Sequence, residues 1–360
     1  MRVVLSGYYG FDNVGDEAIL YSIVQALREK KPDIEITVLS NNPAYTKQTY
    51  QVDAVNRWKM KDVMQAIKEA DGLISGGGSL LQDQTGLKSI PYYCGIMKIA
   101  QHYKKQVFVY AQGMGPINKA ISKWLVKATL NKVQHITVRD TSSKQLLKDI
   151  GVSKDVHVVP DPVMGINLAS FQNSWLESQD LKKSFITVSV RDWPSTIHFK
   201  DEIAKSLDQL VQDGHDIVFI PMHGEHDDQT SKEVAALMAE KSYIAPFHST
   251  IEEKISIIGK SKLLIGMRLH SLIFSAINLV PFVALSYDPK IDAFAHICDQ
   301  PIAGHVEESN WDHQSLTQHI HTILNQYADV KEQLELRVKP LQASALQTAE
   351  NSIQAFSSHM

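Results

Sequence analysis

The sequence predicts an α/β protein made of two doubly wound, Rossmann-like domains that face a cleft. Short β-branched runs alternate with amphipathic helical segments, as in parallel sheets covered by helices. A polar stretch around 164–183 interrupts this alternation, which then starts again. The 360 residues exceed the usual single core, and 44% hydrophobic content suffices for two. We therefore predict domains at 1–165 and 184–314, a linker at 166–183 and a helical tail at 315–360.

The strands of the first domain are short runs rich in Val and Ile. We expect them at 2–6, 34–40, 72–76, 106–111, 135–139 and 156–160. The helices between them have apolar side chains three or four positions apart. They are expected at 17–30, 61–70, 91–103, 121–130 and 142–150.

The second domain repeats the pattern on a smaller scale. Its strands are expected at 185–190, 215–221, 261–266 and 281–286, and its helices near 199–212, 228–240, 251–259 and 269–279. The tail is helical, and Pro340 predicts a kink or break in it.

Composition excludes several classes of protein. The 36 basic and 40 acidic side chains give a net charge of −4, without the basic surface that nucleic acid requires. Cys94 and Cys298 have no metal-ligand spacing, and a disulfide is not expected. The N-terminus is predicted to be a strand rather than a signal peptide, and no apolar run approaches the ~20 residues of a membrane span. We expect a cytoplasmic protein.

Open α/β sheets bind ligands beyond the carboxyl ends of their strands, so the residues after each strand are the candidates. The first such segment, SGYYGFDNVGDEAIL at 6–20, has glycines for a tight turn before a helix near Asp16. Its spacing is not that of a dinucleotide loop, and its acidic residues would repel a pyrophosphate. Asp12, Asn13 and Asp16 suit hydroxyl groups better, although Asp16 alone is also explained as a turn residue and helix N-cap.

The third strand is followed by GLISGGGSLLQD at 72–83. Gly76, Gly77 and Gly78 would expose a row of backbone N–H groups that binds an anion or lets a sugar approach closely. The alternative is that these glycines only relieve crowding where the domains meet. AQGMGP at 111–116 is expected to be a tight turn.

Arg139 closes the fifth strand, and Asp140 is expected to cap the helix after it. An arginine there can bind a carboxylate or phosphate with two parallel hydrogen bonds. The alternative is a structural ion pair of Arg139 with Asp140 or Asp161.

Two segments of the second domain carry polar groups: VRDWP at 190–194 and PMHGEHDD at 221–228. The latter holds five possible metal ligands, but in a predicted loop without a helical i, i+4 pair, so we do not expect a metal.

GMRLHS at 266–271 follows another strand and opens a helix. Arg268 and His270 would lie at the helix N-terminus, where positive charge is unfavourable unless an anion binds. Lys290, one loop further on, is within reach of the same crevice. The alternative is a His270 hydrogen-bonded in the core and a solvated Arg268.

Several of these segments together resemble the polysaccharide pyruvyl transferase family, and within it the branch that acts on bacterial secondary cell-wall polymers. They are GYYGFDNVGDEAIL, GLISGGGSLLQD, YAQGMGPI, TVRD, PDP at 160–162 and GMRLHSLIFSAI. The resemblance implies a glycosyltransferase-B-like fold and transfer of a pyruvyl group from phosphoenolpyruvate to a sugar, which forms a ketal and releases phosphate. It implies donor-binding roles for Arg139, Arg268, Leu269, His270 and Lys290, and acceptor-side roles for Asp12, Asn13, Gly77, Gly78 and Asp83.

The residues agree with this assignment for a chemical reason. Phosphoenolpyruvate carries a carboxylate and a phosphate, about three negative charges that several fixed cations must match. Arg139 and Arg268 would clamp the anion with help from Lys290. His270 would either donate a proton or hold the phosphate. An acidic group such as Asp12 or Asp83 would activate the sugar hydroxyl.

No step requires a metal or a redox cofactor. A lipid-linked acceptor would bring the enzyme to the inner face of the membrane. Two alternatives share this architecture: a nucleotide-sugar glycosyltransferase and a non-catalytic glycan-binding protein. The sequence indicates neither the acceptor sugar nor the oligomeric state.

Overall fold

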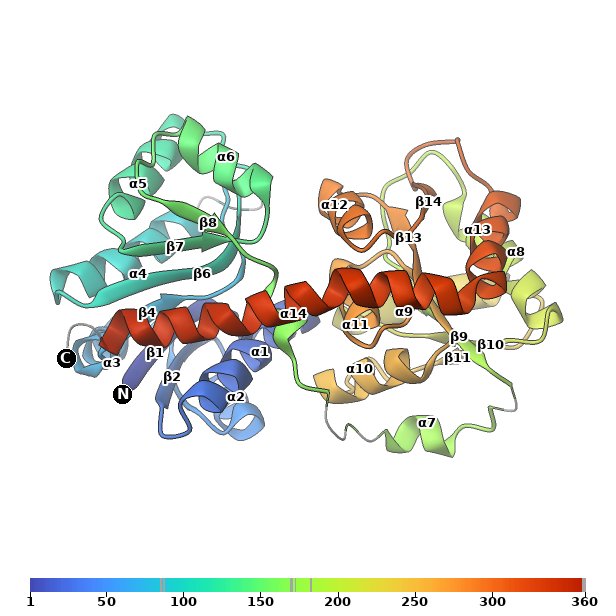
Figure 1. Cartoon of the computed structure of the whole chain (residues 1–360), viewed down its shortest axis with the longest axis horizontal. Helices are drawn as coiled ribbons and strands as arrows, with labels where there is room; N and C mark the ends of the chain where they lie inside the picture. Colours follow the sequence, from blue (N-terminus) through green and yellow to red (C-terminus); the bar gives the residue numbers. More distant parts are fainter. Residues whose placement is uncertain (85, 87, 169–170, 172, 182, 358–360) are drawn as a thin grey trace. The chain divides into compact units, whose positions relative to one another are not determined.

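The computed structural model describes residues 1–357 except 85, 87, 169–170, 172 and 182. The chain forms two compact units. Unit 1 comprises Met1–Asn167 and Leu341–Met360, and unit 2 comprises Leu168–Pro340. In each unit, helices cover a parallel sheet (Figure 1).

The strands of unit 1 are β1 Arg2–Tyr9, β2 Glu35–Ser40, β3 Asp53–Asn56, β4 Gly72–Ser75, β5 Gly78–Leu81, β6 Gln106–Met114, β7 His135–Val138 and β8 Val156–Val158. They form one parallel sheet in the order β3-β2-β1-β4-β6-β7-β8, with β5 paired to β6. Because all strands run the same way, their carboxyl ends meet at one edge.

The helices of unit 1 are α1 Val14–Lys30, α2 Pro43–Tyr50, α3 Met60–Glu69, α4 Ser89–His102, α5 Ala120–Leu130 and α6 Thr141–Asp149, followed by the 3₁₀ turn η1 Pro162–Gly165. The sequence did not predict β3, β5 or α2. Helix α2 was missed for a physical reason. Only Thr46 and Tyr50 are buried, so the helix has no apolar stripe that the sequence pattern could reveal.

Unit 2 has the strands β9 Phe185–Ser189, β10 Asp216–Phe219, β11 Tyr243–Ile244, β12 Leu263–Gly266, β13 Phe282–Ser286 and β14 Ile302–His305. They form a parallel sheet in the order β11-β10-β9-β12-β13-β14. Its helices are α7 Ser174–Ser178, α8 Phe199–Gln212, α9 Gly224–Leu237, α10 Ile251–Lys260, α11 Leu269–Ile277, α12 Pro289–Ile297 and α13 His313–Asn325. The sequence did not predict β11, β14, α7 or α12.

The tail predicted at 315–360 is divided between the units. Helix α14, Tyr327–Ser357, continues through Pro340, so the break predicted there is not present. The boundary between the units falls directly after Pro340, and Phe356 packs in unit 1 where Gly72 leaves room for its ring. Of the predicted linker, residues 169, 170, 172 and 182 lie outside the described residues, as do 358–360 of the tail.

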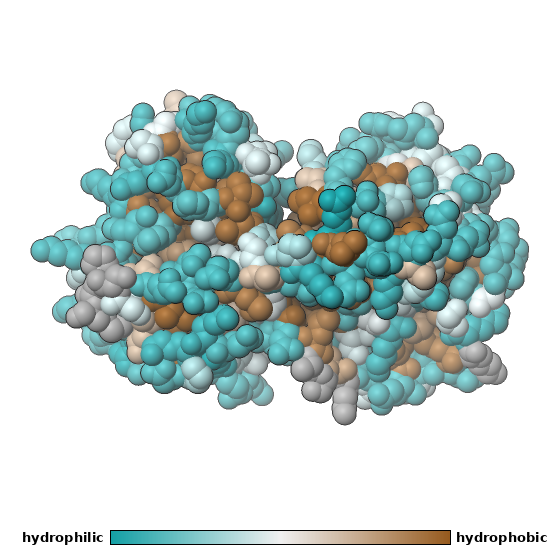
Figure 2. Space-filling model, viewed as in Figure 1, coloured by the Kyte–Doolittle hydropathy of each residue, from teal (hydrophilic) through white to brown (hydrophobic). Residues whose placement is uncertain are grey.

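Helix α14 has 31 residues but is polar along much of its length. Within the described residues, no helix is both long and apolar enough to cross a membrane. Hydrophilic residues make up much of the visible surface of each unit (Figure 2).

Candidate active site

Arginine, lysine and histidine side chains follow four neighbouring strands of unit 2. His223 comes after β10, Arg191 after β9, Arg268 after β12 and Lys290 after β13. Because these strands are parallel and adjacent, the side chains share one edge of the sheet. This group, together with His270, is called the cationic edge below.

Arg268 is held by a buried carboxylate. Its Nε donates to Oδ2 of Asp227 at 2.9 Å, and its Nη2 donates to Oδ1 of the same residue. Asp227, in the first turn of α9, is 1% exposed and also accepts the backbone N–H of Met222 at 3.2 Å. Two parallel hydrogen bonds fix the plane of the guanidinium. The alternative of a solvated Arg268 is therefore wrong.

Arg191 is held by aromatic side chains. Its Nη1 donates to the hydroxyl of Tyr287 at 2.8 Å, and its guanidinium carbon lies 4.7 Å from the centre of that ring and 4.9 Å from that of Trp193. No described carboxylate forms a salt bridge with Arg191 within 4.0 Å. Its charge is therefore available to an anion.

His223 is the N-cap residue of α9, where its side chain makes no capping hydrogen bond. Burial lowers the pKa of its imidazole, and the charges of Arg268, His226 and Arg191 lower it further, while Asp227 opposes the shift. The neutral imidazole is thereby favoured. His223 would contribute a hydrogen bond rather than a charge.

Leu269 and His270 lie in the first turn of α11, and both are partly buried. Arg268 is the N-cap of this helix and makes no capping bond through its side chain. Lys290 lies in the first turn of α12, with its Nζ 3.8 Å from Oδ2 of Asp288. The structure thus brings Arg268, Leu269, His270 and Lys290 to one sheet edge, and their roles stay predictions.

The stretch 221–228 is not the loop that the sequence predicted, because α9 begins at Gly224. Asp227 pairs with Arg268, and Asp228 pairs with Lys232 at 2.6 Å. The described part of the chain contains no group of three or more His, Cys, Asp or Glu side chains able to hold a metal ion.

In unit 1, Arg139 forms a buried ion pair. Its Nη1 lies 3.1 Å from Oδ2 of Asp161, and its Nη2 donates to Oγ of Ser79 at 3.2 Å. Of the two structural partners considered for Arg139, Asp161 is the observed one. Asp140 instead caps α6 by accepting the backbone N–H of Ser143 at 2.6 Å, as predicted.

The glycine run at 76–78 lies against side chains of its own unit. A Cβ atom at Gly76 would be 2.1 Å from the hydroxyl of Tyr9, and one at Gly78 would be 2.7 Å from Oδ1 of Asp16. Gly78 also has a φ of +84°, which disfavours side chains. The crowding therefore comes from β1 and α1 of unit 1.

Asp16 is the most perturbed carboxyl group at this edge. Burial raises its pKa to about 7, the carboxylates of Glu17 and Asp161 act in the same direction, and Arg139 opposes the shift. Asp16 is not the N-cap of α1, because Asn13 accepts the N–H of Gly15 at 3.0 Å in that role. A carboxyl group with this pKa can exchange protons near neutrality.

The other acceptor-side residues have local structural contacts. Gly77 packs against Ile19, and Asp83 accepts the backbone N–H groups of Asn118 and Lys119, both at 2.9 Å. Asp12 is exposed at a φ of +57°. Acceptor binding by Asp12, Asn13, Gly77, Gly78 and Asp83 stays a prediction.

Sequence reasoning missed Asp227 and Tyr287 and gave Arg191 no role. It also preferred Asp12 or Asp83 over Asp16 as the acidic group. One signal was available for Arg191, because VRDWP directly follows a strand. Asp227 could not be found in this way, because it pairs with a residue 41 positions away.

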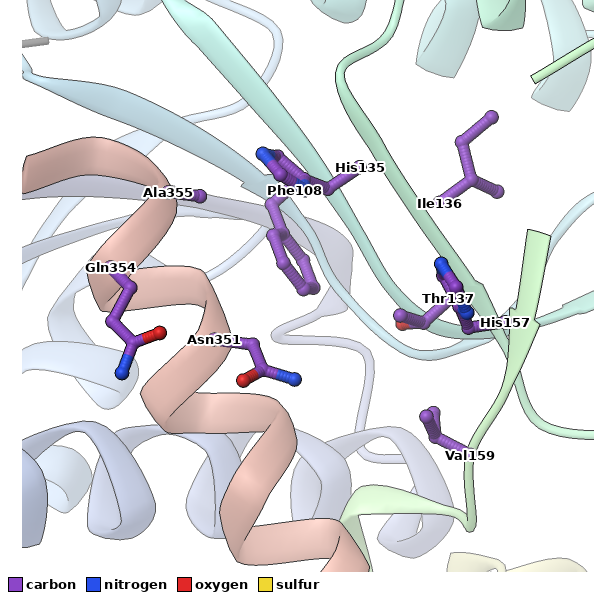
Figure 3. A pocket seen from close by; sticks show the side chains of 9 residues that line it. All are labelled: Phe108, His135, Ile136, Thr137, His157, Val159, Asn351, Gln354 and Ala355. Atoms are coloured by element: carbon purple, nitrogen blue, oxygen red, sulfur yellow. The ribbon is translucent and has the colours of Figure 1, made fainter. Parts of the chain in front are cut away.

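A cavity of about 680 Å³ opens elsewhere in unit 1 (Figure 3). Phe108, His135 and His157 line it from the sheet, and Asn351 and Gln354 face it from α14. None of the candidate site residues lines this cavity.

Solved structures show the class of fold. HepE of Anabaena, in complex with UDP and glucose, is similar with a TM-score of 0.64 at 10% identity, over 99% of this chain and 100% of that one. A UDP-GlcNAc 2-epimerase of Neisseria meningitidis, bound to UDP-GlcNAc, has a TM-score of 0.64 at 9% identity over the same shares of the two chains. The fold is glycosyltransferase-B-like with two Rossmann-like domains, which confirms the predicted fold class.

The sequence defines the family within this fold. The chain belongs to the polysaccharide pyruvyl transferase family, whose sequence signature matches residues 13–289. It is also 20% identical to the amylovoran biosynthesis protein AmsJ of Erwinia amylovora, over 94% of this chain and 96% of that protein. The resemblance to this family seen in the sequence motifs is thereby confirmed. Both findings support a role in pyruvyl transfer during polysaccharide synthesis.

Proposed function

We propose that this protein transfers the pyruvyl group of phosphoenolpyruvate to a sugar of a polysaccharide precursor, with formation of a pyruvate ketal and release of phosphate. The observation that carries the proposal is the cationic edge of unit 2. It offers Arg191, Arg268 and Lys290 as cations and His223 and His270 as further hydrogen-bonding groups. An anion with a carboxylate and a phosphate matches this set.

The two arginines of this edge are held in different ways, and each could contribute differently to binding the donor. Arg268 is fixed by Asp227, so its position is set before the donor binds. Arg191 packs against the rings of Trp193 and Tyr287 and has no carboxylate partner among the described residues within 4.0 Å. Fixed cations of this kind stabilise charge on a departing phosphate without reorganisation during the reaction.

The proposed reaction balances without a cofactor. A proton is added to the methylene carbon of phosphoenolpyruvate, and C2 gains oxocarbenium character. One sugar hydroxyl attacks C2 and loses its proton, which replaces the proton given to the methylene carbon. The bond from C2 to the phosphate oxygen then breaks, a neighbouring hydroxyl closes the ketal, and the proton of that hydroxyl is taken up by the leaving phosphate. His270 is the proposed proton donor, and phosphate binding is its alternative role.

Asp16 is the proposed base for the sugar hydroxyl, in place of Asp12 or Asp83. Its pKa of about 7 lets the carboxylate accept a proton at neutral pH and lose it again. The oxygen Oδ1 lies against Gly78, 2.7 Å from the position that a Cβ atom would occupy there. The donor-binding role of Arg139 stays a prediction, as does its action together with Arg268 on one anion.

The test is release of phosphate from phosphoenolpyruvate in the presence of a panel of amino-sugar and galactose glycosides. We expect acceptor-dependent release and a product whose mass corresponds to the ketal. Thermal stabilisation by UDP-sugars but not by phosphoenolpyruvate would instead indicate a nucleotide-sugar glycosyltransferase. Glycan binding without phosphate release from any acceptor would indicate a non-catalytic protein.

The acceptor and the site of action are proposed on the family resemblance alone. We propose a precursor of a secondary cell-wall polymer as acceptor and the cytoplasm, at the inner face of the membrane, as location. Product analysis with lipid-linked and free acceptors tests the first, and fractionation of cells tests the second.

A further inference from the structure

We propose that aromatic side chains at the carboxyl edge of unit 1 form a binding platform for the pyranose rings of a glycan. The platform consists of one buried arginine, Arg57, three aromatic rings around it, Phe11, Trp58 and Tyr92, and the ring of Tyr8, which stacks on Phe11. We call it the aromatic platform. Its assignment to the acceptor glycan rests on the proposed function. The predicted acceptor-side residues include none of these five.

The aromatic platform lies where open α/β sheets bind ligands. Tyr8 is near the end of β1 and Phe11 follows it, whereas Arg57 and Trp58 directly follow β3. Tyr92 comes from α4. These segments belong to the same parallel sheet and its covering helix, so they meet at the carboxyl edge of unit 1.

Arg57 organises the rings from beneath. It is 3% exposed, and it donates to the backbone oxygen of Gly7 at 2.8 Å and to the hydroxyl of Tyr93 at 3.1 Å. Its guanidinium carbon lies 4.4 Å from the centre of the Tyr92 ring and 5.2 Å from that of Trp58. Its buried Nε has no hydrogen-bond acceptor among the described residues. The charge of Arg57 therefore lies against the rings.

Two rings of this group remain open to solvent. The side chain of Trp58 is 58% exposed and that of Tyr8 is 40% exposed. Tyr8 stacks on Phe11 with ring centres 4.0 Å apart and planes 7° apart, and Phe11 in turn lies 5.2 Å from the Arg57 guanidinium. The indole nitrogen of Trp58 donates to Asn41 at 3.0 Å, which fixes the orientation of the ring. Rigid aromatic rings supply contact area at low entropic cost.

The chemistry of the aromatic platform favours a neutral ligand with a flat apolar face and a polar rim. A pyranose ring has C–H groups on its faces and hydroxyl groups around its edge. Exposed rings match the faces. Asn41, which accepts the indole N–H of Trp58, and Asp12, which follows Phe11 in the chain, are exposed polar residues that can form hydrogen bonds with hydroxyls, Asp12 as an acceptor. Because the charge of Arg57 is buried beneath the rings and Asp12 is acidic, a phosphate is matched less well.

The experiment is saturation-transfer NMR on the full chain with methyl glycosides of glucose, galactose, N-acetylglucosamine and N-acetylmannosamine. We expect saturation of the C–H protons on one face of at least one glycoside. Trp58→Ala should weaken this binding about tenfold, because one aromatic contact of this kind is worth roughly a factor of ten. Trp58→Phe should recover part of it, since a ring remains.

Trp124→Ala is the matched control. Trp124 is 60% exposed on α5 of the same unit but takes no part in the aromatic platform. Its replacement should leave the glycoside signal unchanged. Tyr8→Ala is a second variant, which removes the ring that stacks on Phe11, and it should reproduce the loss in Trp58→Ala.

The following outcomes would contradict the proposal that the aromatic platform binds a glycan. Absence of saturation for all four glycosides, or equal signals in Trp58→Ala and Trp124→Ala, would refute it. Saturation of uridine instead of the glycosides would assign the rings to a nucleobase. Trp58-dependent binding to vesicles of anionic lipid without glycoside binding would assign them to a membrane. Because NMR binding needs no phosphoenolpyruvate, a protein that binds glycosides yet releases no phosphate would refute the proposed function and leave the platform standing.

Discussion

Arg268 is bound in a two-pronged ion pair by Asp227, a carboxylate that is 1% exposed and that the sequence places 41 positions away. The pair joins the N-terminus of α11 to the first turn of α9. A buried carboxylate left without its partner is costly, so neither residue can be replaced neutrally.

Asp227→Asn tests this pair without a large change in volume. The amide cannot match both guanidinium donors, so Arg268 loses its fixed plane. We expect a loss of about 3 kcal/mol in the free energy of unfolding and a KM for phosphoenolpyruvate about tenfold higher. Denaturant titration and steady-state kinetics measure the two effects. Asp228→Asn, which removes the ion pair with Lys232, a side chain that is 59% exposed, is the matched control. Unchanged kinetics in Asp227→Asn would contradict a positioning role for Asp227.

Tyr287→Phe removes a single hydroxyl from Arg191. The 2.8 Å hydrogen bond to the guanidinium is lost, while the ring contact remains. Hydrogen bonds to charged groups contribute about 1.5–3 kcal/mol, so we expect the KM for phosphoenolpyruvate to rise at least about tenfold at nearly constant kcat. Tyr243→Phe, whose hydroxyl donates to a backbone oxygen of the same unit at 3.2 Å, should have no such effect.

Asp16→Asn tests the proposed base through pH. The carboxylate form is needed to accept a proton, so wild-type kcat should rise with pH through about 7. The variant should lose this limb and at least about 100-fold in kcat. An unchanged pH profile would exclude Asp16 as the base.

Asp16 also predicts how stability varies with pH. Its pKa is higher in the folded state than its ordinary 3.8, so between pH 3.8 and about 7 the folded state holds a proton that the unfolded state has lost. The contribution of Asp16 to stability is therefore present at low pH and falls as pH rises through this window. In Asp16→Asn, denaturant titrations across the window should lack this fall.

The buried Lys254 should give the free energy of unfolding the opposite dependence on pH, in the alkaline range. Its ammonium group is buried on α10, donates to the backbone oxygen of Phe247 at 3.0 Å, and has its pKa lowered by burial to about 8. Between pH 8 and 10.5 the unfolded state holds more protons, so stability should rise with pH relative to Lys254→Met. The exposed Lys123→Met is the control and should run parallel to wild type.

Arg139→Lys tests whether the planar fork matters in unit 1. Lysine keeps the charge but cannot bind Asp161 and Ser79 together with the same geometry. We expect a lower melting temperature and loss of most pyruvyl transfer. Arg2→Lys, at an exposed pair with Glu35, should change neither. Full activity in Arg139→Lys would show that only the charge of this residue is needed.

The sequence alone determined the two-domain α/β architecture, the family and the positions of Arg139, Arg268 and His270 after their strands. Local information was sufficient there, because β-branched runs, apolar periodicity and the position of a residue after a strand are readable along the chain. Short or polar elements such as α2 and β11 were missed, because they carry too little of that periodicity.

Only the tertiary structure decided what surrounds each site residue. The pairing of Arg268 with Asp227 and the bond from Arg191 to Tyr287 join residues 41 and 96 positions apart. The pKa of Asp16 depends on burial and on Arg139 and Asp161, which the fold brings near it. The rings around Arg57 come from three separate segments. Ion pairing, burial and ring contacts depend on which residues are neighbours in space. Those neighbours are far apart in the chain, so a local sequence pattern does not reveal them.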